Sequence, residues 1–157
     1  MRLEYFQLID RIIDLNLNDL TIRVEANVPT ESTIFEGHFP GRPLMPGVLL
    51  IESMAQASGW LIIARTRFAK MPFLAALDDV KLRTFVTPGQ KLTVSAKIAH
   101  EGSGFAKTEA SIQHDGKPIC NAEIMFRVVD FPPGDFSKHM HEMAQRIALP
   151  IETVRYG

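Results

Sequence analysis

The chain has 157 residues, of which 46% are hydrophobic and 22% charged, a balance typical of a soluble globular protein. This length predicts one domain with a single core. The formal net charge of −1 argues against nucleic acid or an anionic membrane as the main partner. The single cysteine, Cys120, excludes an internal disulfide and indicates a reducing compartment. The first ten residues lack a signal-peptide pattern, so we expect a cytoplasmic protein.

The first thirty residues predict a short helix followed by a β-hairpin. Apolar residues at helical spacing indicate an amphipathic helix over residues 3–10. Two strands are expected next, Arg11–Leu17 and Leu20–Val28, joined by a turn at Asn18-Asp19. In the second strand apolar residues alternate with polar ones, which is the period of a half-buried strand.

The stretch GHFPGRPLMPGVLLIESMAQASGW (37–60) joins a loop to a helix. We expect Pro29–Pro46 to be irregular, because its X-Pro steps and glycines disfavour helix and sheet alike. Pro46 suits the first position of a helix that runs from Gly47 to Arg65 or Arg67. This helix is apolar nearly all round, so other structure should enclose it. A membrane span needs roughly 20 apolar residues, and polar or small residues interrupt this run, so we expect no membrane span: Glu52, Ser53, Gln56, Ser58 and Gly59.

The rest of the chain predicts an antiparallel sheet and a C-terminal helix. With one long helix and about six strands, we expect an α+β fold in which a curved antiparallel sheet wraps around the central helix. A C-terminal extension, residues 130–157, should begin with a break at Phe131–Gly134 and form a helix over Ser137–Leu149, capped by Ser137 or Asp135. The expected strands are Phe73–Val86, Lys91–His100, Phe105–His114 and Ile119–Val129, with turns at Thr87–Gly89, Glu101–Gly104 and Asp115-Gly116.

Two ionisable residues of the 37–60 stretch are candidates for chemistry, His38 in the loop and Glu52 in the helix. An ionisable group in apolar surroundings is costly unless it has a function or a partner. A metal site is not expected, since His139 and His141 would point to different helix faces and no further ligand spacing completes a set. No P-loop, dinucleotide-binding glycine fingerprint or Ser-His-Asp set is present.

The motif HFPGRPLMPGVLLIESMAQ resembles the signature of the bacterial 3-hydroxyacyl-acyl carrier protein dehydratases of hotdog fold. The segment LAALDDVKLRTFVTPGQKL resembles the part that follows their central helix, and the likeness covers residues 10–129. Two segments depart from the family. EYFQLIDRI replaces the usual N-terminal His-Arg-Tyr-Pro-Phe stretch, and the chain continues past the usual end from about Asp130.

The resemblance implies a hotdog domain over residues 1–157 that uses no cofactor. It also implies a homodimer whose sheets join edge to edge, with three dimers often forming a hexamer. Each active site would lie at the dimer interface, where His38 of one subunit faces Glu52 of the other. Acyl carrier protein would deliver the substrate. Six basic residues are candidates to meet it, although most single residues of such a set are solvated surface charges: Arg42, Arg65, Arg67, Lys70, Lys81 and Arg83.

The reaction implied is removal of water from a (3R)-3-hydroxyacyl thioester to give the trans-2-enoyl product in fatty acid biosynthesis. His38, framed by Phe39, Pro40 and Gly41, would take the α-proton. Glu52 would protonate the departing hydroxyl, and its apolar neighbours should favour the protonated form. A mechanism in which His38 makes both transfers stays open. Glutamate rather than aspartate at position 52 resembles the branch that does not isomerise its product.

Two further residues are candidates for supporting roles. The backbone N–H of Gly47 could hold the thioester oxygen at the start of the helix, or the glycine could serve the turn alone. Gln56 lies one turn after Glu52 and could orient it, or could bond only to backbone. The altered chain ends suggest long or specialised acyl chains. The alternatives are a hotdog thioesterase and a non-catalytic relative that binds acyl carrier protein.

Overall fold

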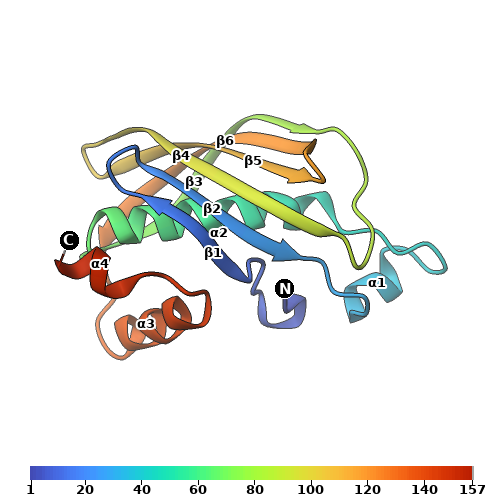
Figure 1. Ribbon diagram of the computed structural model, residues 1–157, viewed down its shortest axis with the longest axis horizontal. Coiled ribbons are helices and arrows are strands. Elements are labelled where there is room, and N and C mark those ends of the chain that lie inside the picture. The colour runs from blue at the N-terminus through green and yellow to red at the C-terminus, as the bar shows by residue number, and fades with distance from the viewer. Residues whose placement is uncertain (157) are drawn as a thin grey trace.

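The computed structural model describes residues 1–156 as a six-stranded antiparallel sheet wrapped around one long helix, which confirms the expected fold class (Figure 1). The strand order is β1-β2-β4-β5-β6-β3. The central helix, α2, spans Gly47–Arg65 and lies along one face of the sheet. The strands are β1 (Arg11–Asn16), β2 (Thr21–Asn27), β3 (Lys70–Leu82), β4 (Lys91–Gly102), β5 (Phe105–His114) and β6 (Lys117–Asp130).

The core lies between α2 and the inner face of the sheet. In β2 the side chains of Ile22, Val24 and Ala26 are buried, whereas those of Arg23 and Glu25 are not. This alternation follows from the two-residue period of a strand. Twelve of the 19 residues of α2 are buried, because the sheet curves around it.

Helix α2 is long and apolar enough to cross a membrane by length and composition. However, 61% of its apolar window is buried inside the protein. The central helix of a soluble protein has the same properties. The burial of α2 is therefore consistent with the soluble protein expected from the sequence.

The predicted helix over residues 3–10 is wrong. Only a 3₁₀ turn, η1 (Leu3–Tyr5), forms there, and Phe6 ends it in a left-handed conformation with φ of 55°. Residues 6–8 then run alongside α2, where the carboxamide of Gln56 accepts from Leu8 N–H at 3.0 Å and donates to Phe6 O at 2.8 Å. These bonds replace the ones a helix would make, and they are long-range, so local periodicity could not reveal them.

The segment Pro29–Pro46 is also more ordered than expected, because a short helix, α1 (Thr33–Gly37), forms within it. Ser32 caps its start by accepting a hydrogen bond from Ile34 N–H at 3.2 Å. Glu4 accepts from both the Ser32 hydroxyl at 2.6 Å and Thr33 N–H at 3.0 Å. The N-terminal turn therefore holds α1 in place.

The C-terminal segment forms two helices where one was expected. Helix α3 spans Phe136–Arg146 with Asp135 at its N-cap position, and α4 spans Ile151–Tyr156. Ala148 adopts a positive φ of 58° and Pro150 follows, which together prevent one continuous helix. In Figure 1, α1 lies near the start of α2 and α3 lies near its C-terminal half.

Strand β3 forms one edge of the sheet and carries exposed apolar side chains. Phe73, Leu74, Leu77, Val80 and Leu82 are each at least 36% exposed. The predicted strand was Phe73–Val86, whereas β3 begins at Lys70 and ends at Leu82. Val86 lies outside the strand, and its carbonyl oxygen accepts a hydrogen bond from Met45 N–H at 2.8 Å. An apolar edge strand of this length is a site where another strand can pair.

Candidate active site

His38 lies immediately after α1, where its backbone N–H bonds to Ile34 O at 3.0 Å. The side chain is half-buried, and its Nδ1 lies 2.9 Å from the carbonyl oxygen of Leu44. A carbonyl oxygen only accepts hydrogen bonds, so Nδ1 carries a proton, and in the neutral imidazole Nε2 then has the lone pair. The loop therefore holds the imidazole in the tautomer that a general base requires.

The loop that follows is closed by its own backbone. Phe39 N–H bonds to Arg42 O at 3.1 Å, and Arg42 N–H bonds to Phe39 O at 2.9 Å. Between them Pro40 fixes its own φ, and Gly41 takes a φ of 72°, which fits the pair Pro-Gly at the centre of a type II turn. The Phe39 ring stacks on that of His38 at 4.1 Å between centroids. Of the predicted frame of Phe39, Pro40 and Gly41, the Phe39 ring contacts the histidine directly, while Pro40 and Gly41 form the turn that follows.

Glu52 lies in the second turn of α2 and is half-buried. Burial raises the pKa of its carboxyl group, and the hydrogen bond from Gln56 acts in the opposite direction. Gln56 Nε2 lies 3.2 Å from Glu52 Oε1. The same carboxamide bonds to the backbone of Phe6 and Leu8, so Gln56 contacts the Glu52 carboxyl group and the backbone at once.

Gly47 is the first residue of α2, so its N–H has no acceptor within the helix and points out of the helix end. A Cβ atom at this position would lie 2.6 Å from Leu82 Cδ1, so a side chain there would displace Leu82. Gly47 lines a cavity of about 410 Å³ that His38 also lines. The loop histidine and the free end of the helix therefore share one cavity.

Glu52 and Gln56 line a different cavity, of about 350 Å³. Gly47 and Glu52 are five positions apart, or about 140° around the helix, so they face different sides of it. One copy of the chain thus brings His38 together with Gly47, and Glu52 together with Gln56, but does not bring the two pairs into one cavity.

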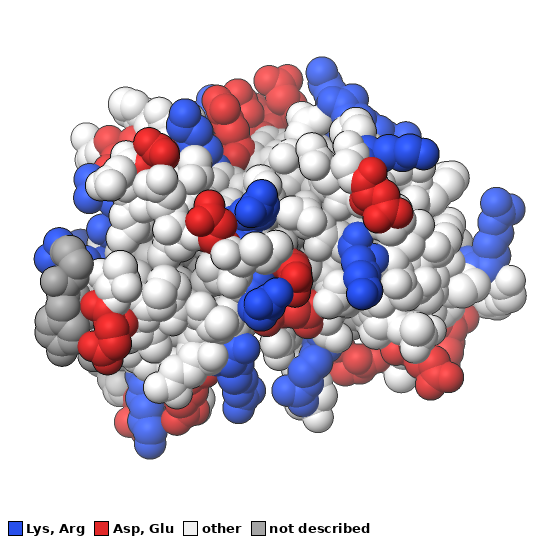
Figure 2. Space-filling view, viewed as in Figure 1, with Lys and Arg blue, Asp and Glu red and all other residues white. Residues whose placement is uncertain are grey.

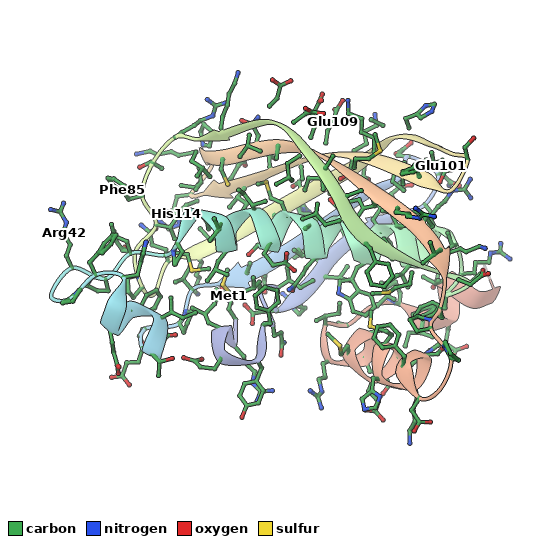
Figure 3. The ribbon with its side chains drawn as sticks, turned by 180° about the vertical axis from the view of Figure 1, so that it is seen from behind. Met1, Arg42, Phe85, Glu101, Glu109 and His114 are labelled. Atoms are coloured by element: carbon green, nitrogen blue, oxygen red, sulfur yellow. The ribbon has the colours of Figure 1, made fainter. Side chains whose placement is uncertain are left out.

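The remaining walls of the His38 cavity include Leu82, Arg83 and Phe85, from the end of β3 and the segment after it. From the sequence, Arg83 was a candidate only for meeting a partner, and Leu82 and Phe85 were not identified as site residues. Figure 3 places Phe85 at the same end of the molecule as Arg42 in the histidine loop. The Leu44 carbonyl was also missed, since a backbone acceptor leaves no signal in residue types.

The basic residues considered for a partner differ in their surroundings. Arg65 pairs with Glu101 at 3.0 Å, and Lys70 pairs with Asp130 at 2.5 Å. Arg83 donates to the Asn121 carboxamide oxygen at 2.6 Å. Arg42 projects from the tip of the histidine loop (Figure 3). On the face shown in Figure 2, acidic and basic side chains are interspersed and neither sign dominates.

The C-terminal histidines are engaged within their own helix. His139 Nδ1 lies 2.9 Å from Asp135 O, and His141 Nδ1 lies 2.7 Å from Ser137 O. Over residues 1–156, the structure contains no cluster of three or more histidine, cysteine or acidic side chains that could hold a metal ion.

Comparison with known proteins decides the family. A model of the FabA-like domain matches residues 2–123. Relatives include the 3-hydroxyacyl-[acyl-carrier-protein] dehydratases FabZ of Francisella tularensis subsp. novicida and subsp. tularensis, each 34% identical over 138 residues, or 80% of this chain and 85% of theirs. The chain belongs to the FabA-like family. The resemblance of its motif to FabZ-type dehydratases is thereby confirmed.

Solved structures resemble this fold at low sequence identity. Conserved protein PA5202 from Pseudomonas aeruginosa is 17% identical, with a TM-score of 0.63 over 80% of this chain and 93% of its own. A hypothetical thioesterase with coenzyme A from Streptococcus pneumoniae TIGR4 is 15% identical, with a TM-score of 0.61 over 78% and 88%. At these identities the likeness supports the fold alone. The FabA-like match ends within β6, before α3.

Proposed function

We propose that this chain is a 3-hydroxyacyl-acyl carrier protein dehydratase of fatty acid biosynthesis, acting in the cytoplasm on (3R)-3-hydroxyacyl substrates without a cofactor. The observation that carries this proposal is the state of two side chains in a FabA-like chain. The bond from Nδ1 of His38 to Leu44 O leaves the lone pair of the neutral imidazole on Nε2, and Glu52 has a pKa raised by burial. One group is thus prepared to accept a proton and the other to donate one.

In the proposed reaction His38 Nε2 takes a proton from the α-carbon of the thioester. The electrons of that C–H bond form the double bond between the α- and β-carbons, and the bond from the β-carbon to the hydroxyl oxygen breaks. Glu52 gives its proton to the departing hydroxyl, which leaves as water. The proton on His38 then returns to Glu52 through solvent, which restores the starting state.

Gly47 and Gln56 support these two steps. Negative charge develops on the thioester oxygen as the α-proton leaves, and the Gly47 N–H at the start of α2 is suited to stabilise it. Gln56 holds the Glu52 carboxyl group while its other bonds fix it to residues 6–8. In this proposal Gln56 is a positioning residue, because it acts through Glu52.

A complete site would require a second copy of the chain. His38 and Glu52 line separate cavities within one copy, so the proposed base and acid meet only if two copies each contribute one of them. The exposed apolar edge of β3 supports a homodimer in which the two sheets join along this strand. Three such dimers would give a hexamer.

The carrier protein would approach the His38 cavity. Arg83 lines this cavity, and Arg42 projects from the loop beside it. Because acyl carrier protein is strongly acidic, these two arginines are better placed to meet it than Arg65 or Lys70, which already pair with acidic residues of the chain.

The test is the appearance of the conjugated enoyl-thioester absorbance when the protein is mixed with a 3-hydroxyacyl-acyl carrier protein. We expect this absorbance to rise with the wild-type protein. In both His38→Ala and Glu52→Gln the rate of the rise should be lower by a factor of about 10²–10⁴. Release of free carrier thiol without enoyl absorbance would instead identify a thioesterase. Binding of the carrier with neither product would identify a non-catalytic relative.

A further inference from the structure

The cavity beside Glu52 extends along α2 toward the C-terminal end of this helix. The helix residues that line it lie along one face of α2, which returns every three to four positions: Glu52, Ala55, Gln56, Gly59, Trp60 and Ile63. From position 52 to position 63 the helix rises by about 16 Å. The wall opposite α2 is apolar and comes mainly from β3, with Met71, Pro72, Phe73 and Leu74.

Helix α3 completes this cavity. Met140 and Met143, three positions apart on one face of α3, line it together with Trp60 and Ile63 of α2. Met140 is only 8% exposed, whereas Met143 is 40% exposed. Both residues lie beyond the FabA-like match, which ends at residue 123. The far wall of the cavity is therefore built by a part of the chain outside the matched domain.

Several contacts fix α3 against the rest of the molecule. Ala144 and Ile147 are buried, and the Ile147 carbonyl accepts a backbone bond from Ile12 N–H of β1 at 2.7 Å. The His141 ring stacks on the Phe68 ring, which follows α2, at 4.2 Å between centroids. The two methionine backbones therefore have fixed positions, while their unbranched side chains can adapt to what enters the cavity.

We propose that α3 closes the acyl-chain site and that Met140 and Met143 set the length of chain it accepts. The inference rests on the proposed function, because it places the thioester end of the substrate at Glu52 and the tail of the acyl chain along α2. An extended chain rises about 1.2 Å per bond, so the ~16 Å of helix accommodates on the order of a dozen bonds before the tail meets α3.

The first test is Met143→Phe, which adds a larger and stiffer side chain at the far wall. Gln145→Phe is the matched control, because residue 145 is exposed on the same helix and does not line the cavity. We expect Met143→Phe to lower kcat/KM at least tenfold for the longest 3-hydroxyacyl substrates and to change it less than twofold for the shortest. Gln145→Phe should keep the wild-type profile. An equal effect of Met143→Phe at every chain length, or no effect, would overturn the proposal.

A second test needs no turnover. Trp60 is the only tryptophan of the chain and lines this cavity, so binding there should change its fluorescence. Trp60 also lines a smaller cavity of about 110 Å³, which is too small for a long acyl chain. The probes are saturated acyl-pantetheine thioesters of increasing length with bromine on the terminal carbon, which quenches tryptophan on contact. We expect saturable quenching of Trp60 that becomes weaker in Met143→Phe and stays unchanged in Gln145→Phe.

The two tests separate the possible failures. If the wild-type protein dehydrates no substrate but the bromine probes quench Trp60, the proposed function is wrong and the acyl site stands. If the protein is an active dehydratase but no probe length quenches Trp60, the acyl chain lies elsewhere and the inference about α3 is wrong.

Discussion

Nδ1 of His38 lies 2.9 Å from the carbonyl oxygen of Leu44, and this bond leaves Nε2 as the basic nitrogen. We expect His38→Ala to reduce kcat by a factor of about 10²–10⁴, because the general base is lost. The free energy of unfolding should change little, since the side chain is only half-buried. His114→Ala is the control, because His114 also bonds through Nδ1 to a carbonyl oxygen, that of Lys91, at 2.8 Å. An equal loss of kcat in both variants would contradict a specific role for His38.

Glu52→Gln should change the pH dependence of stability as well as activity. Burial raises the pKa of Glu52 above its unfolded value, so the ionised carboxylate destabilises the folded state. The wild-type protein therefore loses stability as pH rises through the raised pKa, and Glu52→Gln does not. Urea unfolding at pH 4 and pH 8 should show the variant gaining relative to wild type at the higher pH. Glu142→Gln, on the exposed face of α3, controls for the loss of a negative charge alone. If Glu52→Gln were instead more stable than wild type at pH 4 and not at pH 8, the pKa of Glu52 would be lowered in the folded state, which contradicts the prediction.

Gln56→Ala removes three hydrogen bonds at once, to Phe6 O, Leu8 N–H and Glu52 Oε1. Leu8 is fully buried, so its N–H would lose its partner without gaining water. We expect a loss of about 1–3 kcal/mol in the free energy of unfolding, measured with urea. Gln113→Ala, at an exposed position of β5, should cost far less. Equal stability of the two variants would show that residues 6–8 are held mainly by other contacts.

Glu4→Gln tests how α1 is held beside His38. Hydrogen bonds from Ser32, and then from backbone groups that include Thr33 N–H, lower the pKa of Glu4 from 4.5 to about 2. A carboxyl group with a lowered folded-state pKa stabilises the fold above its unfolded pKa and loses that contribution as pH falls from 4.5 through about 2. The difference in Tm between wild type and Glu4→Gln should therefore be present at pH 7 and shrink toward pH 2. If the difference in Tm were the same from pH 7 to pH 2, the ionised Glu4 carboxylate would not be its cause, which would contradict the prediction.

The strands and the central helix could be predicted because their signals are local. Consecutive residues of β2, β4, β5 and β6 show the two-residue alternation of a strand. The Asp115-Gly116 pair likewise indicates a tight turn, and both residues have positive φ angles in the structure. The segments that were wrong depend on partners far along the chain. Residues 3–10 do not form a helix, because Leu8 N–H bonds to the Gln56 side chain. Helix α1 is stabilised by Glu4, which accepts a hydrogen bond from Thr33 N–H in the first turn of α1.

In the candidate site, too, the features that the sequence could predict are local and those it could not predict depend on the fold. The motif identified His38 and Glu52 as candidates, and their catalytic roles remain a proposal. The sequence could not show that the two residues open into separate cavities, because this depends on the direction in which α2 presents positions 47 and 52. Nor could it show Met140 and Met143 beside Trp60, since these residues are about 80 positions apart and meet only in the fold.

The central claim is that two copies of the chain share each site, and mixing two inactive variants tests it most directly. His38→Ala and Glu52→Gln are unfolded together in urea and refolded as a mixture, with each variant refolded alone as a control. Random pairing gives half hybrid dimers, each with one intact site, so we expect about a quarter of wild-type dehydratase activity to return. If His38 and Glu52 instead act within one chain, every site in the mixture lacks one of them, and the mixture stays as inactive as its parents.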